Sequence, residues 1–178
     1  MRPTDICKQV LGADKLRAVL DELSAPQIKA VLKEGGVKVK LPGGYTSQKK
    51  RRALWTDKVC ASVEQGNEEA GGELLQQWLL HHRRQMLIDL LDRLEVKHRQ
   101  GETDESFLVS GSTEKIRDGA TWLFEKHDRV EAVAYLRYIA YQQRSPVFDG
   151  WDRMEVAADG TADAGAADAG TDQDAPPQ

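Results

Sequence analysis

Four consecutive cations, Lys49-Lys50-Arg51-Arg52, form the densest cluster of side chains with an evident chemistry in this sequence. They are followed by Ala53-Leu54-Trp55 and stand at the start of an expected amphipathic helix. A phosphate backbone benefits both from such cations and from the exposed amides of a helix N-terminus. The run therefore indicates binding of a polyanion. The alternatives are a solvated face paired with acidic residues elsewhere in the chain, or an acidic protein or lipid partner.

The distribution of charge along the chain favours the same interpretation. Residues 1–60 contain 13 Lys and Arg against 6 Asp and Glu, a net of +7. Residues 61–156 contain 12 against 18, a net of −6, and residues 157–178 contain five Asp and no cation. The overall net charge of −4 thus hides a basic N-terminal segment, and clustered positive charge is the electrostatic footprint of nucleic-acid-binding proteins.

Other residues capable of chemistry lack the spacing that a known mechanism requires. The sequence contains no GxSxG, GxxxxGK[ST] or GxGxxG motif, and its histidines form neither HExxH nor a Cys/His zinc pattern. Carboxylates such as Asp89 and Asp92 are most simply explained by pairing with cations one helical turn away. We therefore predict a non-enzymatic protein with no catalytic residue, no metal site and no cofactor.

Helical periodicity of the apolar residues predicts an all-α fold. We expect helices over 5–23 with a break at Gly12, over 24–35 with Ser24 as cap, and over 48–63 capped by Thr46 or Ser47. Further helices are expected over 73–98, 113–126 and from 128 to about 144. Residues 37–41 alternate as a short strand does, but the following Pro-Gly-Gly makes a turn or loop at least as plausible. Glycines near residue 70 predict a boundary between a basic helical module (1–65) and a bundle-like helical domain (70–155). An acidic tail without large apolar side chains (156–178) is expected to be disordered.

Residues 24–63 resemble a SAP-type helix–extended loop–helix module, a small DNA-binding fold. The similarity lies in Ala25-Pro26-Gln27-Ile28-Lys29 and Leu32 on a first helix, a Gly36-Val37 turn, Gly44, and Lys49-Lys50 leading into a second helix with Leu54. The loop is longer than is usual in that family, and the second-helix spacing differs. The resemblance implies that basic residues of the loop and helix start contact the DNA backbone: Lys38, Lys40, Lys49, Lys50, Arg51 and Arg52. It also allows Tyr45 to stack on a sugar or base.

Three tyrosines, Tyr135, Tyr138 and Tyr141, fall on adjacent angles of the last expected helix. They either belong to the core or, if exposed, form an interface for a protein partner or a second copy of the chain.

No apolar run approaches the length of a membrane span, and the N-terminus lacks the apolar core of a secretory signal. Cys7 and Cys60 form no metal or disulfide framework. We therefore expect a cytoplasmic protein without a membrane partner. The predicted function is backbone-contacting DNA binding through the basic module, with a helical interaction domain. The alternative is a protein–protein adaptor that binds no nucleic acid.

Overall fold

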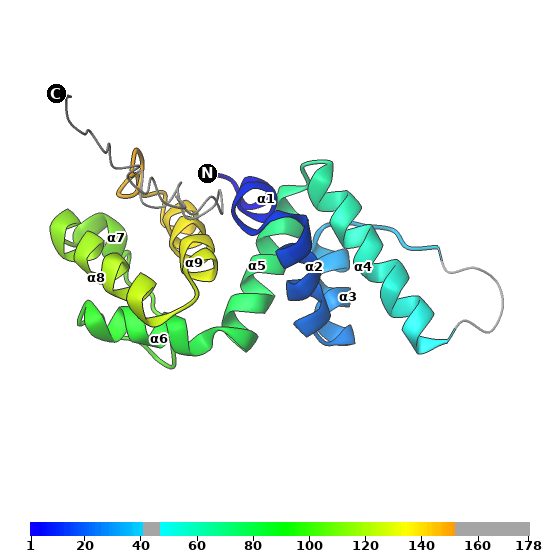
Figure 1. The fold of residues 1–178 in the computed structure, drawn as a ribbon, viewed down its shortest axis with the longest axis horizontal. Coiled ribbons are helices and arrows are strands. Elements are labelled where there is room, and N and C mark those ends of the chain that lie inside the picture. Colours follow the sequence, from blue (N-terminus) through cyan, green and yellow to red (C-terminus); the bar gives the residue numbers. More distant parts are fainter. Residues whose placement is uncertain (41–46, 152–178) are drawn as a thin grey trace, which may run out of the picture.

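The computed structural model describes residues 1–40 and 47–151, shown in Figure 1. Within these residues the chain is all-α, as predicted, and residues 37–40 form no strand. The predicted tail (156–178) lies outside the described residues.

The first part of the chain contains α1 (Pro3–Asp5), a π-helical segment (Ile6–Leu11), α2 (Gly12–Glu22), α3 (Ala25–Glu34) and α4 (Gln48–Glu64). The expected break is found at Gly12, whose φ of 70° is a conformation that glycine adopts readily. The expected cap of α3 is also present, because the Ser24 amide donates to Oε1 of Gln27 at 2.7 Å.

The single helix predicted over 73–98 is wrong. The structure has α5 (Glu68–His82) and α6 (Arg84–Arg93), separated at Arg83, whose φ of −129° is not helical. Of the glycines near residue 70, Gly71 and Gly72 lie inside α5, whereas Gly66 precedes it. A Cβ added at Gly71 would stand 3.1 Å from the Thr4 amide nitrogen, so glycine here permits close packing of α1 against α5.

The remaining helices are α7 (Phe107–Ser110), α8 (Thr113–Lys126) and α9 (Arg129–Gln142). The side chains of Ser112 and Asp128 cap α8 and α9 by accepting hydrogen bonds from backbone amides of the first turns. After α9 the chain folds back. Phe148 is buried, and its ring centroid lies 5.5 Å from that of Trp151, which in turn lies 5.8 Å from Phe124.

Helix α5 is the central element that both parts of the molecule share (Figure 1). It packs against α3 and α4, and its C-terminal end leads into α6. A second connection between the two parts is the packing of the π-helical segment against α9. The buried apolar residues of both parts form one continuous cluster. This cluster continues across residue 70. The domain boundary near that residue stays a prediction.

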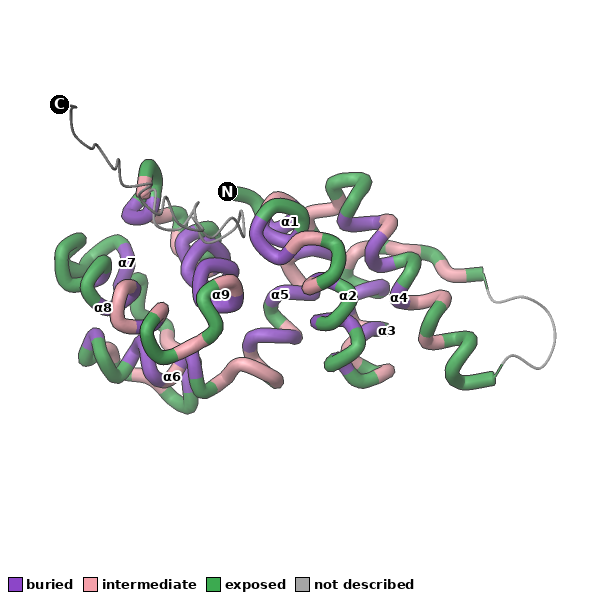
Figure 2. Tube along the Cα trace, viewed as in Figure 1, coloured by how far each residue is buried: buried purple, intermediate pink, exposed green. Residues whose placement is uncertain are grey.

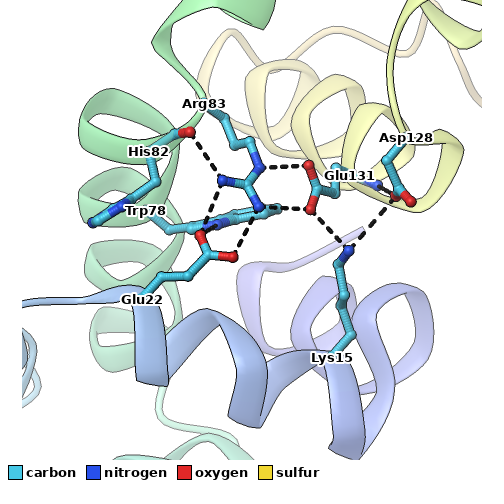
Figure 3. Close-up of polar contacts among 7 residues, drawn as sticks. All are labelled: Lys15, Glu22, Trp78, His82, Arg83, Asp128 and Glu131. Carbon is cyan, nitrogen blue, oxygen red and sulfur yellow. Dashed lines mark hydrogen bonds and ion pairs between the residues drawn. The ribbon is translucent and has the colours of Figure 1, made fainter.

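A polar network at the end of α5 adds to this connection (Figure 3). The Arg83 guanidinium donates to Glu22 on α2, with both N–O distances 2.9 Å, and to Glu131 on α9. The ammonium of Lys15 lies 2.8 Å from the same Glu131 carboxylate. These ion pairs fix α2, α5 and α9 relative to one another.

Candidate nucleic-acid interface

The first turns of α4 carry the basic run, and most of its residues are exposed (Figure 2). Ser47 caps this helix, because its Oγ accepts a hydrogen bond from the Lys50 amide at 3.3 Å. No acidic residue lies in the first turn. The positive end of the helix dipole therefore coincides with clustered cations, an arrangement that a bound anion would stabilise.

The guanidinium of Arg52 contacts the backbone of α2. Its Nη2 donates to the backbone carbonyls of Leu20, Asp21 and Leu23, at 3.2, 2.8 and 2.7 Å. These carbonyls lie at the C-terminal end of α2, where a cation is favourable. Arg52 thus anchors α4 to α2 and has fewer donors left for a ligand.

A groove lies between the starts of α3 and α4. It has a volume of about 550 Å³, and Ala25, Lys29, Gln48, Lys49, Arg51, Arg52 and Trp55 line it. The Lys29 ammonium stands 5.0 Å from the centroid of the Trp55 ring, a cation–π contact. The groove therefore combines an aromatic surface with several cations.

The predicted contacts do not all lie in this groove. Lys49, Arg51 and Arg52 line it, whereas Lys50 is exposed on α4 outside the lining. Lys38 and Lys40 are exposed on the segment after α3, which ends at the same end of the molecule as the start of α4 (Figure 1). Tyr45 lies outside the described residues.

Lys29 and Trp55 were not predicted as site residues. Trp55 follows Arg51 by four residues, so both lie on one face of α4. An aromatic residue at this distance from a cation is a signal that the sequence contained. Lys29 was not identifiable in this way, because only the packing of α3 against α4 brings it to Trp55.

The proposed pairing of the basic run with acidic residues of the same chain has limited support. No ion pair joins Lys38, Lys40, Lys49 or Lys50 to a carboxylate within the part of the chain that the structure describes. The ion pairs between the two parts involve other cations, such as Lys15. Within the described residues, the lysines of the basic run are therefore not neutralised by a carboxylate.

The three tyrosines do not form one exposed stripe. Tyr135 and Tyr138 are 2% and 6% exposed and belong to the core, whereas Tyr141 is 44% exposed. Successive positions three residues apart rotate around the helix, so only the last of them reaches the surface. The three tyrosines therefore do not share an exposed face, which an interface formed by all three would require.

Two histidines contact carboxylates. His127 Nε2 lies 2.8 Å from the buried carboxylate of Asp89, which also binds Lys126 and Gln85. Burial alone would raise the pKa of Asp89, yet these hydrogen bonds outweigh it and lower the pKa below its ordinary value. His98 Nε2 lies 2.9 Å from Asp92, and its Nδ1 accepts from the Gly101 amide. Both arrangements join segments of the fold.

No cluster of His, Cys, Asp or Glu suited to a metal ion is found among the described residues. No helix in the same residues combines the length and apolarity needed to cross a bilayer. No protein-family model matches the chain, and the searches of curated proteins and solved structures found no match. The SAP-like resemblance of residues 24–63 therefore stays a prediction.

Proposed function

We propose that this chain is a non-enzymatic nucleic-acid-associated protein that binds the phosphate backbone of DNA through the basic segment. The observation that carries this proposal is the groove between α3 and α4, which Lys29, Lys49 and Arg51 line together with Trp55. Cations bind phosphates and release counterions, and an aromatic face accepts a base or sugar. The SAP-like resemblance favours the same ligand.

Lys38, Lys40 and Lys50 extend the positive surface beyond the groove, and Arg52 chiefly holds α4 in place. Contacts of this kind are made to the backbone, so little sequence preference is expected. The part of the chain formed by α6 to α9 would then serve a protein partner or a second copy of the chain.

The test is fluorescence anisotropy of labelled duplex DNA titrated with the full-length chain at several salt concentrations. With about four phosphate contacts, log K falls against log[salt] with a slope of roughly −4. The double variant K49A/R51A weakens binding and reduces this slope by about 2. The matched control is K97A/R99A, which removes two exposed cations outside the groove and leaves the slope unchanged.

A protein–protein adaptor is the alternative function. It is favoured by the open groove of about 640 Å³ at the end of α9, where the exposed Tyr141 lies beside Met1 and Pro146. The titration distinguishes the two functions, because an adaptor gives no saturable DNA binding at any salt concentration. Equal binding by K49A/R51A and the unmodified chain would contradict the proposed site.

A further inference from the structure

A further cavity, which shares no residue with the basic groove, lies between α5, α6, α9 and residues 101–106. Its volume is about 340 Å³, within the range of small-molecule sites in proteins. Its apolar wall consists of Leu79, Leu80, Leu87 and Ile139. Such a lining favours a ligand with an apolar body.

Two tyrosines complete this wall, and their hydroxyls differ. The Tyr138 hydroxyl donates to the Gly72 carbonyl and accepts from Gln142 Nε2, both at 3.0 Å. The Tyr135 side chain is 2% exposed, and its hydroxyl has no hydrogen-bond partner among the described residues. A buried hydroxyl is ordinarily paired, and this one is left without a partner in a residue that lines the cavity.

The charged side chains that line the cavity are all acidic. Glu102, Asp104 and Glu105 line it, and no Lys, Arg or His of the described chain does so. Glu102 lies 3.6 Å from Arg84, but the carboxylates of Asp104 and Glu105 have no ion-pair partner in the described segments. Unpaired carboxylates attract a cation, and so do the negative faces of aromatic rings.

We propose that this cavity binds a small organic cation, an amine or quaternary ammonium compound with an apolar body. The apolar wall and the tyrosines hold the body of the ligand, and Asp104 and Glu105 attract its charge. This site does not depend on the DNA-binding function, because it shares no residue with the basic groove.

The test uses benzyltrimethylammonium as a probe, titrated into the ¹⁵N-labelled full-length chain and followed by amide chemical shifts. We expect saturable shifts at residues around the cavity, with a Kd of about 1 mM for so small a ligand. Phenylacetate, an anion with the same ring, is expected not to bind. The variant D104N/E105Q weakens binding of the cation at least about threefold, since two carboxylates are lost.

The matched control is E64Q/E69Q, which removes the same charge from exposed positions that do not line the cavity. This control is expected to bind the probe as the unmodified chain does. The proposal is overturned if the probe gives no saturable shifts near the cavity, or if phenylacetate binds equally well. It is also overturned if both double variants bind alike.

Discussion

The Glu131 carboxylate on α9 accepts hydrogen bonds from both Nε and Nη2 of Arg83, the residue that separates α5 from α6 (Figure 3). The Glu131 side chain is 10% exposed, so its charge is largely removed from water. A carboxylate in this position requires a partner, and Arg83 supplies it while also binding Glu22. Arg83 thus lies at the bend between α5 and α6, and its side chain also joins α2 to α9.

Substitution of Arg83 by alanine is expected to lower the free energy of unfolding by about 2–4 kcal/mol. It leaves the buried Glu131 carboxylate with Lys15 as its one ion-pair partner among the described residues. Urea denaturation followed by circular dichroism measures this loss. The control is Arg17→Ala, which breaks an exposed ion pair with Asp57 and costs about 0–1 kcal/mol. Similar losses in both variants would show that the Arg83 network contributes no more than a surface pair.

Stability is expected to fall in acid through Glu131. Burial alone would raise the pKa of this carboxyl, but the hydrogen bonds from Arg83 and Lys15 outweigh it and lower the pKa below the ordinary 4.5. Because the folded pKa is the lower one, the stabilisation is complete above pH 4.5 and is lost as the pH falls through the folded pKa.

The measurement is urea unfolding of the unmodified chain and of Glu131→Gln between pH 7 and pH 3. The variant is expected to be less stable at pH 7, and the difference between the two proteins shrinks as the pH falls below 4.5. A difference that stays constant over this range would mean that Glu131 titrates with its ordinary pKa.

Tyr135 and Tyr138 provide a matched pair for the energetics of the core. Tyr138→Phe removes a hydroxyl with two hydrogen bonds and is expected to cost about 1 kcal/mol. Tyr135→Phe removes a buried hydroxyl without a partner among the described residues, so the change in unfolding free energy is expected within about 0.5 kcal/mol of zero or stabilising. Equal destabilisation by both, measured by urea unfolding, would indicate that the Tyr135 hydroxyl has an ordered partner in solution.

Sequence reasoning succeeded where the cause of a structure is local. Ser24 with Gln27, Ser47 and Asp128 cap their helices through hydrogen bonds that span three residues, and such patterns are visible in a sequence. The break at Arg83 was missed because its partners Glu131 and Glu22 lie 48 and 61 residues away. The apolar periodicity of residues 73–98 continues past Arg83, so it does not indicate that the helix ends there.

The candidate site shows the same division. The basic run is local and was identified directly, whereas the roles of its members were not distinguishable. Arg52 contacts carbonyls 29 to 32 residues earlier in the chain, and Lys29 reaches Trp55 only because α3 packs against α4. Which cation stabilises the fold and which faces solvent is therefore decided by tertiary packing.

The last prediction concerns the hydrogen bonds between Arg52 and the end of α2. Arg52→Ala is expected to lower the free energy of unfolding by about 1–3 kcal/mol, because three carbonyls at the end of α2 lose a charged donor. Lys50→Ala is expected to change it by less than about 0.5 kcal/mol, since Lys50 is exposed. Urea unfolding of both variants measures these values.

Arg52→Lys refines this test. An ammonium keeps the favourable charge at the helix C-terminus but has no fork of donors, so about half of the lost stability is expected to return. In the DNA titration, Lys50→Ala is then expected to weaken binding without affecting the fold, while Arg52→Ala acts mainly through stability. If Arg52→Ala leaves unfolding unchanged and reduces DNA affinity as strongly as K49A/R51A, Arg52 is a ligand contact and its role as an anchor of α4 is refuted.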